Sequence, residues 1–422
     1  MMYRFYRAVT YCAASIFSVV LKKRTKKNKE HPSRINEKKG IATLPRPSEK
    51  LIWIHAASVG EAQSALILIN KISEHQKDIK ILITTGTLTS ANLMEKRLPK
   101  NAFHQFYPLD HPKWTKRFLK HWRPDLVLWM ESELWPNMLY EVKKQNIPAF
   151  LINARMSERS FKRWKYFKSL ISTTLNAFHH ILCQTENDKM YYDALCNVEI
   201  TVTDNIKYSS SPLEYNEDDL HEIKQTIQTR PVWLYASTHD GEEEIACEIH
   251  NNLKEHIQDI LTIIVPRHPE RRDQIKETCQ NVNSTFRGSS KNLPDKNTDI
   301  YIADTMGELG LFYVLSPIAC IGRSLSNDGG GGHNPIEAAQ HNCAVLYGPN
   351  VQNLQEIFDE MNHQQAAHQV KNKQQLQTEI KRILETPDQC EVMQKKAKHY
   401  ASQKISVIDN VMDILKPTLE DL

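Results

Sequence analysis

The chain has 422 residues, of which 40% are hydrophobic and 25% are charged, as is ordinary for a globular protein. This length exceeds what one hydrophobic core usually serves, so we expect two domains. The formal net charge of +4 is unevenly spread, because residues 1–50 hold 13 Lys/Arg against 3 Glu (net +10) and the other 372 residues carry −6. The acidic body argues against general nucleic-acid binding.

Eight cysteines lie at positions 12, 183, 196, 247, 279, 320, 343 and 390, without a CxxC pair. Several stand in apolar runs, such as Cys320 in PIACIG and Cys343 in CAVLYG, where a buried free thiol is the usual occupant. We therefore expect a reducing compartment, with neither a disulfide framework nor a structural zinc site.

The N-terminal segment contains a 14-residue mostly apolar run, Ala8 to Leu21, preceded by Arg4 and Arg7 and followed by KKRTKKNK. Fourteen residues fall short of the roughly 20 that span hydrocarbon, but snorkelling arginines can extend such a helix. Lysines rather than small residues follow the run, which disfavours a cleaved signal peptide. We expect a membrane-anchor helix over 1–21 with its basic tail against cytoplasmic headgroups. The alternative is an ordinary buried helix with a solvated tail.

A polar, proline-containing stretch then predicts a basic linker that ends at residue 50. Short apolar runs alternate with helical patterns after it, at 51–56, 79–85, 125–130, 148–153, 180–184, 198–203, 232–237, 261–266, 299–304, 317–322 and 343–348. Apolar strands separated by helices indicate parallel sheets covered on both faces. Two such sets predict two doubly wound domains. Ligands bind such sheets beyond the carboxyl ends of the strands, so the residues after each run are the candidates for chemistry.

In the first half, HAASVGE follows the first apolar run and precedes a helical pattern. Gly60 permits a tight turn, which leaves Glu61 at the start of the helix. A carboxylate there can act as a general base for a sugar hydroxyl, or it can stabilise the helix N-terminus through the macrodipole. Glu131 and Glu133 follow the third run beside a Trp-Pro pair, which is unusual for a purely structural turn. A helix cap plus one solvated acid is the alternative.

In the second half, Arg267 ends an apolar run within VPRHPER and can pair bidentately with phosphate. Four glycines, 329–332, then precede a helix start, and glycine lets backbone amides approach an anion. Pro335 suits the first turn of a phosphate-binding helix, and Glu337 can accept hydrogen bonds from a ribose. The glycine run alone is also compatible with a flexible surface turn, but together with the basic stretch it predicts a nucleotide site.

Three histidines of the second half, His239, His268 and His333, show neither HxxH nor HExxH spacing. Hydrogen-bonded histidines are favoured over ligands, and we expect no required metal and no cofactor. Two basic-aromatic stretches, 113–123 and 155–168, suit a phospholipid or nucleic-acid surface, or are amphipathic helices with a solvated face. Because they lie in the half opposite the nucleotide motifs, we favour an anionic acceptor and no nucleic acid.

Nine motifs between about residues 51 and 360 resemble, in order, those of the 3-deoxy-D-manno-oct-2-ulosonic acid (Kdo) transferases of Gram-negative bacteria. They are HAASVGE, ITTGTLTSA, YPLDHP, LVLWMESELWPN, INARMSERS, ASTHDGEE, VPRHPERR, DTMGELG and GGGHNPIEAA. One such motif is a weak signal, but nine in register are specific. The N-terminal apolar segment also fits this family.

The resemblance implies a GT-B fold, in which two Rossmann-like doubly wound domains face a cleft. An anchor helix (1–21) and a basic linker (22–50) precede an acceptor domain (51–205) and a CMP-Kdo-binding domain (206–422), whose terminal helix can pack back on the first domain. The implied reaction is inverting transfer of Kdo from CMP-Kdo to the lipid A precursor lipid IVA, in lipopolysaccharide synthesis. The implied place is the phospholipid surface on the cytoplasmic side of the inner membrane.

Residue roles follow by matching motifs. Glu61 is the implied general base, and Glu131 is an acid that supports the transition state. The implied CMP-binding residues are Pro266, Arg267, Met306, Gly307, Glu308, Asn334, Pro335, Ile336 and Glu337. Lys207 matches a charge-stabilising lysine in a Gly-Ser-Leu-Lys segment of the family, but Asp204 and Asn205 replace its small pair. The run Gly329–Gly332 also departs from the family, lengthening or loosening the anion-binding turn.

Two other functions remain open from the sequence. One is a different GT-B nucleotide-sugar enzyme, either a UDP-sugar transferase or an epimerase. The other is a non-catalytic membrane scaffold that keeps the nucleotide fold, although the presence of all the matched charged residues speaks against it.

Overall fold

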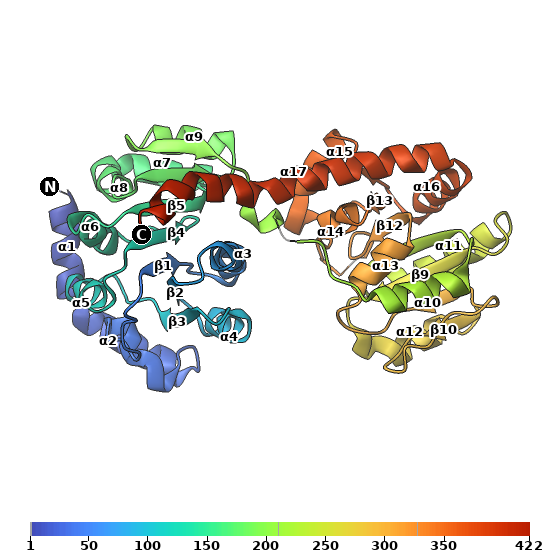
Figure 1. The fold of residues 1–422 in the computed structure, drawn as a ribbon, viewed down its shortest axis with the longest axis horizontal. Coiled ribbons are helices and arrows are strands. Elements are labelled where there is room, and N and C mark those ends of the chain that lie inside the picture. Colours follow the sequence, from blue (N-terminus) through green and yellow to red (C-terminus); the bar gives the residue numbers. More distant parts are fainter. Residues whose placement is uncertain (1, 210, 327) are drawn as a thin grey trace. The chain divides into compact units, whose positions relative to one another are not determined.

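The structure is a computed structural model that describes residues 2–209, 211–326 and 328–422. It divides into two compact units (Figure 1). Unit 1 comprises the residues up to 210 together with 404–422, and unit 2 comprises 211–403. The sequence placed this boundary at 205.

Unit 1 is built on a seven-stranded sheet in the order β3-β2-β1-β4-β5-β6-β7, with every described pairing parallel. Its strands are β1 (Leu51–His55), β2 (Lys80–Thr85), β3 (Ala102–Phe106), β4 (Leu126–Met130), β5 (Ala149–Ala154), β6 (His180–Cys183) and β7 (Glu199–Val202). Its helices after β1 are α3 (Val59–His75), α4 (Leu88–Arg97), α5 (Pro112–Trp122), α6 (Pro136–Lys144), α7 (Glu158–Tyr166), α8 (Lys168–Leu175) and α9 (Glu186–Asp193). A short 3-10 helix, η2 (Ile206–Tyr208), follows β7.

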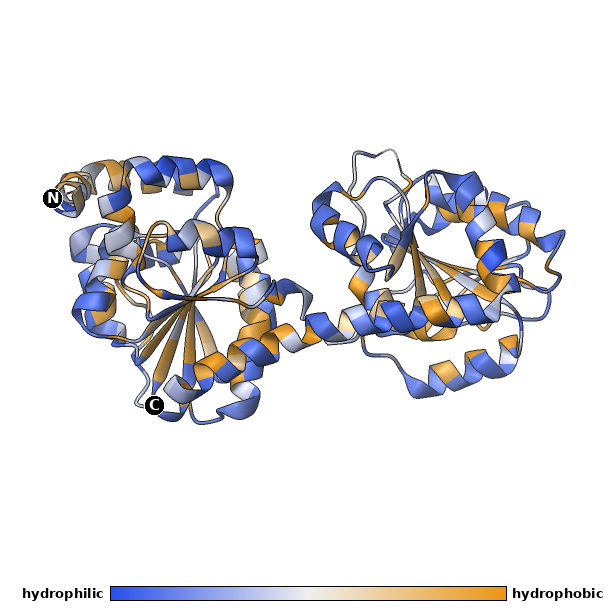
Figure 2. Cartoon of the chain, turned by 90° about the horizontal axis from the view of Figure 1, so that it is seen from above, coloured by the Kyte–Doolittle hydropathy of each residue, from blue (hydrophilic) through white to orange (hydrophobic). Residues whose placement is uncertain are grey.

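The core of unit 1 lies on both faces of its sheet. Trp53 packs into one apolar cluster, whereas its neighbours Ile52 and Ile54 pack into the other, as the alternation of side chains along a strand requires. Helices cover both faces, and Figure 2 shows hydrophobic residues concentrated along the strands. The predicted doubly wound α/β arrangement is therefore confirmed for this unit.

The N-terminal segment forms two helices, α1 (Met2–Cys12) and α2 (Ala14–Lys26), instead of the single helix expected over 1–21. The inward side of α1 is polar, because Tyr6 donates to the Asp110 carboxylate at 2.9 Å and Thr10 accepts from Asn137 at 2.9 Å. These contacts hold α1 on unit 1. No helix among the described residues combines the length and apolarity needed to cross a bilayer.

The stretch expected as a linker contains an ordered 3-10 helix, η1 (Pro32–Lys39), with Glu37 and Lys38 buried. The Glu37 carboxylate accepts from Arg34 Nε at 2.8 Å and from the backbone N–H of Phe106 at 2.7 Å. Composition alone indicated a linker because this segment is polar. The contact with Phe106 of β3 is distant in sequence, so the local sequence does not reveal it.

Unit 2 has a second parallel seven-stranded sheet, in the order β10-β11-β9-β8-β12-β13-β14. Its strands are β8 (Val232–Thr238), β9 (Leu261–Pro266), β10 (Ser284–Phe286), β11 (Ile300–Ile302), β12 (Ile318–Ile321), β13 (Ala344–Tyr347) and β14 (Ala367–Gln369). Its helices are α10 (Glu217–Ile227), α11 (Glu242–Lys254), η3 (Pro269–Arg271), α12 (Arg272–Thr278), α13 (Leu309–Leu315), α14 (Pro335–Gln340), η4 (Gln352–Leu354), α15 (Gln355–His363) and α16 (Lys373–Glu385).

The last helix, α17 (Pro387–Glu420), begins in unit 2 and ends in unit 1. Its C-terminal part contributes apolar side chains to the core cluster that contains Ile52, namely Val407, Ile408, Val411, Leu415 and Leu419. Asp204 forms an ion pair with Lys404 of the same helix. The final residues of the chain therefore complete the first unit.

Candidate active site

In each unit the strand order reverses at one point, between β1 and β4 in unit 1 and between β8 and β12 in unit 2. Ligands of open α/β sheets bind beyond the carboxyl ends of the strands at such a reversal. Glu61 follows β1 and Glu131 follows β4. His239 follows β8, and Arg323 follows β12. The candidate residues thus lie at the two places where the topology favours a site.

Glu61 is held at the start of α3 by a reciprocal cap. Ser58 Oγ accepts from the Glu61 backbone N–H at 3.2 Å and donates to Glu61 Oε1 at 3.3 Å. The Ala57 N–H donates to Glu61 Oε2 at 2.6 Å. This resembles a capping box, with the Ala57 N–H in place of the N-cap N–H, so the capping role that the sequence left open is present. The same contacts fix the direction in which the carboxylate points.

The environment of Glu61 also suits proton transfer. Its side chain is buried, at 6% exposure, and burial raises the pKa of its carboxyl to about 7. The Ala57 N–H acts against this rise, whereas the negative charges of Glu131 and Glu133 add to it. A carboxyl that titrates near the operating pH is what a general base requires.

Glu131 follows β4 in a left-handed backbone conformation, with φ at 55°. Asn153 Nδ2 donates to its carboxylate at 3.4 Å. Burial raises the pKa of Glu131, while Asn153 and the positive charges of Arg155 and Lys207 counteract that rise. The structure therefore brings Glu61, Glu131 and Lys207 into one electrostatic group within unit 1.

The loop that carries Lys207 accommodates Asp204 and Asn205, which replace the small pair expected from the family resemblance. Asp204 adopts φ at 70°, a conformation that glycine takes readily, and Lys404 pairs with its carboxylate. Asn205 Oδ1 accepts from the Lys207 N–H at 3.0 Å and so caps η2. The larger pair is accommodated by these two side-chain contacts.

Asn153, at the end of β5, was not singled out from the sequence as a site residue. Its Oδ1 accepts from the Ile206 N–H at 3.1 Å, and its Nδ2 reaches Glu131. It therefore connects the Glu131 loop with the Lys207 loop. A polar residue at the carboxyl end of an apolar strand is the signal that identifies it.

In unit 2, Arg267 follows β9, and its exposed guanidinium forms no hydrogen bond or ion pair with any other described residue. Burial raises the pKa of nearby Glu337, and the hydrogen bond from Asn334 and the charge of Arg267 offset only part of that rise. The charge of Arg267 also contributes to lowering the pKa of His333, of which burial is the main cause. Asn334 caps the six-residue α14, accepting from the Ile336 N–H at 3.1 Å and donating to Glu337 at 3.2 Å. Pro335 and Ile336 are buried and position these polar neighbours.

Met306, Gly307 and Glu308 line a separate hollow of about 520 Å³, next to α10 and the loop after β10. Met306 is 72% exposed, whereas Glu308 is held by the buried guanidinium of Arg287 at 2.7 and 2.9 Å. Burial would raise the pKa of Glu308, but the hydrogen bonds from Arg287 and Thr305 lower it. The hollow is not lined by Arg267 or Asn334, so the predicted donor residues form two groups.

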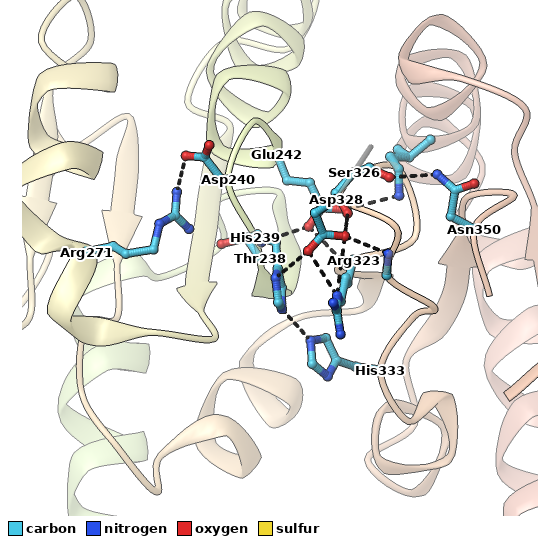
Figure 3. A network of polar contacts seen from close by, with 12 residues as sticks. Thr238, His239, Asp240, Glu242, Arg271, Arg323, Ser326, Asp328, His333 and Asn350 are labelled. Atoms are coloured by element: carbon cyan, nitrogen blue, oxygen red, sulfur yellow. Dashed lines mark hydrogen bonds and ion pairs between the residues drawn. The ribbon is translucent and has the colours of Figure 1, made fainter. Parts of the chain in front are cut away.

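Figure 3 shows a polar network around Asp328, centred on the loop after β12. Asp328 accepts from Arg323 Nε at 3.0 Å and lies 3.2 Å from His239 Nδ1. His239 Nε2 lies 3.0 Å from His333 Nε2. Burial, the neighbouring histidine and two arginines lower the pKa of His333 to about 4. These histidines are hydrogen-bonded, and the described residues contain no cluster of three or more His, Cys, Asp or Glu arranged for a metal.

The glycine run, Gly329–Gly332, is not simply a flexible surface turn. Gly329 and Gly332 have φ at 72° and 67°, and a Cβ at Gly330 would collide with Arg323 and Asp328. The run is therefore required by the backbone path and by close packing on the network.

The two basic-aromatic stretches behave differently. In α5, Trp114, Phe118 and Trp122 are buried in the core, so this stretch is an amphipathic helix with a solvated basic face. In α7 no residue is buried, and Tyr166 directly after a basic run is 85% exposed. A hollow of about 340 Å³ lies here, lined by Ser160, Arg163, Trp164 and Phe167.

The two parallel doubly wound units have a GT-B-like fold. UDP-GlcNAc 2-epimerase from Neisseria meningitidis has a similar fold, with a TM-score of 0.55 and 15% identity, over 88% of this chain and 100% of that one. A glycosyltransferase from Rickettsia africae has a TM-score of 0.53 and 16% identity, over 89% of this chain and 100% of that one. At these identities the likeness is one of fold alone.

Sequence comparison identifies the family. The family model described as 3-deoxy-D-manno-octulosonic-acid transferase (kdotransferase) matches residues 33–210. A 3-deoxy-D-manno-octulosonic acid transferase of Rickettsia bellii is 34% identical over 421 residues, covering 99% of this chain and 98% of the relative. That of Haemophilus influenzae is 32% identical over 405 residues, covering 93% of each. The chain belongs to the Kdo transferase family of glycosyltransferases.

Proposed function

We propose that this chain transfers Kdo from CMP-Kdo to the lipid A precursor lipid IVA, with inversion, during lipopolysaccharide synthesis. Family membership supports Kdo transfer. The observation that carries the mechanism is Glu61, a buried, capped carboxyl whose pKa is raised to about 7 at the topological reversal of unit 1.

In the proposed reaction, Glu61 accepts the proton of an acceptor hydroxyl as that oxygen attacks the anomeric C2 of Kdo. The C2–oxygen bond to CMP breaks with departure of CMP, which carries away the bonding electron pair. Attack opposite to the leaving group inverts the anomeric centre. Glu61 keeps its geometry because Ser58 and Ala57 already hold both carboxylate oxygens.

The negative charge that develops on the CMP phosphate requires a cation. Arg267 of unit 2 supplies an exposed guanidinium, and a guanidinium can donate two parallel hydrogen bonds to phosphate. Because the leaving group is a monophosphate rather than a pyrophosphate, we expect side-chain cations to suffice without a metal. Lys207 is proposed to stabilise charge beside Glu131, whose pKa is raised by burial against the opposing charge of Lys207.

The exposed surface of α7 is proposed to contact the acceptor. It begins at Glu158, shortly after β5, the strand whose Asn153 donates to the Glu131 carboxylate. Arg163 and Trp164 together present a cation and an aromatic face in its hollow. This combination suits a phosphorylated, acylated sugar.

Membrane attachment is proposed to occur through the outward face of α1 and α2. Phe5 is 73% exposed and Val9 51%, and their spacing of four residues places them on one face of α1. Ile16 of α2 is 63% exposed. Lysines follow at positions 22, 23, 26, 27 and 29. An exposed apolar face beside lysines suits a helix lying in the headgroup region of an anionic membrane. We therefore propose an inner-membrane, cytoplasmic location by surface attachment.

Mass spectrometry of lipid IVA after incubation with the protein and CMP-Kdo tests the reaction. We expect a mass increase by whole Kdo units, both with and without EDTA. No increase, together with binding of UDP in preference to CMP, would assign the chain to another GT-B enzyme. No increase and no nucleotide binding would indicate the scaffold function.

Sedimentation with vesicles tests the attachment. We expect the chain to sediment with vesicles containing phosphatidylglycerol, and the double variant Phe5→Ser/Val9→Ser to remain largely in the supernatant. Leu44→Ser/Ile41→Ser, which alters exposed apolar residues away from α1 and α2, is the control. Equal sedimentation of all three proteins would remove this surface from the proposal.

A further inference from the structure

Lys38 is a buried lysine in η1, outside every motif that carried the family resemblance. Its residue is 4% exposed, and burial lowers the pKa of its ammonium to about 8, so it is still charged at neutral pH. Nζ donates to the Gly86 carbonyl at 2.8 Å and lies 5.0 Å from the centroid of the Phe106 ring. Burying a charged group is costly unless it is paired, so these contacts define where the ammonium must lie.

The partner of Lys38 is the first link of a short path to Glu61. The Gly86 N–H donates to the Ala57 carbonyl at 3.1 Å, and the Ala57 N–H donates to Glu61 Oε2 at 2.6 Å. The approach is close, because a Cβ at Gly86 would lie 2.8 Å from the Ala57 oxygen. The loop after β2 therefore presses directly on the loop that supports the carboxylate.

The segment that carries Lys38 is itself fixed on both sides. The neighbouring Glu37 binds the backbone of β3 through the Phe106 N–H, and the Leu109 N–H donates to the Lys38 carbonyl at 3.0 Å. Gly40 adopts φ at 72° where it passes against the Trp114 backbone of α5. A lysine on a flexible linker would not be placed so precisely.

We propose that Lys38 is a positioning residue for Glu61, acting through Gly86 and Ala57. This inference rests on the proposed role of Glu61 as general base. Lys38 itself touches neither donor nor acceptor in this account. Its ammonium holds the Gly86 loop against Ala57, and that contact keeps the Ala57 N–H aligned with the Glu61 carboxylate.

Loss of the Lys38 contact should change the pKa of Glu61, which a general loss of folding stability would not do. The Ala57 N–H lowers the pKa of Glu61, so weakening this hydrogen bond raises that pKa. The acid limb of kcat/KM then moves to higher pH. The path joins Lys38 to Glu61, and other charged or titratable groups surround both residues. Those beside Glu61 are Glu131 and Glu133. Those around Lys38 are Arg24, Glu30, Glu37, His55 and His104. Burial lowers the pKa of both histidines to about 3, so neither titrates in the same range.

The test compares Lys38→Met with Lys38→Arg and with Lys39→Met. Methionine keeps the apolar stem and removes the donor, whereas arginine restores a donor and a charge. Lys39 is the matched control, because its side chain forms no hydrogen bond or ion pair among the described residues. The pKa of Glu61 is read by 13C titration of carboxyl-labelled glutamate, using the signal that is absent in Glu61→Gln.

We expect the Glu61 titration to move to higher pH in Lys38→Met, to return toward the original position in Lys38→Arg, and to stay in place in Lys39→Met. Transfer by Lys38→Met should show a lower kcat, by up to about 10²-fold, because small misplacement of a catalytic group is costly. Its KM for CMP-Kdo should be unchanged. An unmoved Glu61 titration in Lys38→Met overturns the inference.

Gly86→Ala provides a second route if Lys38→Met does not fold. Its methyl group would press on the Ala57 carbonyl, so the Glu61 titration should move in the same direction. If that titration also stays in place, the path is refuted. Because the titration needs no turnover, a chain that fails to transfer Kdo would refute the proposed function while the Lys38 inference is still decided.

Discussion

The two units share an architecture and differ in the charges that follow their strands. Each is a parallel seven-stranded sheet with one reversal of strand order. At the reversal of unit 1, burial raises the pKa of Glu61 and Glu131. At that of unit 2, burial and arginines lower the pKa of His239 and His333. The same fold thus carries acids with a raised pKa in one unit and histidines beside arginines in the other, and the proposed roles of proton transfer and anion binding rest on these side chains at the sheet edge.

Glu61→Gln is expected to have the largest effect of the variants that test this difference between the units. Without an ionisable group at this position, we expect transfer to fall by about 10²–10⁴-fold, the usual contribution of a general base. CMP binding, which we assign to unit 2, should be retained in calorimetry. Turnover close to that of the unchanged protein would show that the acidic edge of unit 1 does not act in catalysis.

A second prediction concerns the stability of unit 2. Arg287→Met removes a fully buried guanidinium and leaves Asp219 and Glu308 without their shared cation. Breaking a buried pair in this way costs about 3–5 kcal/mol. Hydrogen exchange of β8, β9 and β12 should report this loss, while the strands of unit 1 keep their protection.

Lys291→Met is the matched control, because Lys291 also binds Asp219 but is half exposed. Its effect should be below about 1 kcal/mol, as for other exposed pairs. Equal losses of stability in the two variants would show that burial of Arg287 does not strengthen its ion pairs.

Arg267→Ala tests the anion-binding character of unit 2. We expect CMP to bind about 10- to 100-fold more weakly, since a hydrogen bond to a charged group contributes about 1.5–3 kcal/mol. Arg267→Lys should recover only part of the affinity, because lysine cannot form the bidentate contact. Lys276→Ala, which removes an exposed cation from α12, should bind CMP normally. Unchanged affinity in Arg267→Ala would assign the phosphate to other residues.

The smallest expected effect is that of Glu133→Gln. The Glu133 carboxylate raises the pKa of Glu61, so neutralising it should lower that pKa and move the acid limb of kcat/KM to lower pH. Because the Glu133 side chain is exposed, added salt should reduce the difference between the two proteins. An acid limb that moves to higher pH would contradict the electrostatic interaction between Glu133 and Glu61.

Much of the fold was predictable because parallel strands buried on both faces leave a clear signal. The apolar runs beginning at Leu51 and at Val232 became β1 and β8, and the two doubly wound sheets are as expected. The N-terminus was predicted less well. A 14-residue apolar run suggested one anchor helix, but Tyr6 before it and Thr10 within it bind Asp110 and Asn137, which lie more than 90 residues away.

For the candidate site, the sequence identified residues that follow strands but not the contacts between them. Glu61 was recognisable within SVGE, whereas its raised pKa depends on burial and on Glu131 and Glu133 from another loop. Arg287 and Arg323 carry no local signal, because their partners lie on separate elements. The catalytic roles of Glu61, Glu131 and Lys207 and the donor-binding residues stay predictions.

The path of α17 has a consequence for how the chain is made. Unit 1 begins near the N-terminus, yet one side of its sheet is covered by Val407, Val411 and Leu415. These residues leave the ribosome after all of unit 2. Until then, apolar side chains around Ile52 and Ile54 lack part of their cover. The first unit is therefore closed only after the second has been made, and a chain that stops after residue 403 would leave that surface open to aggregation.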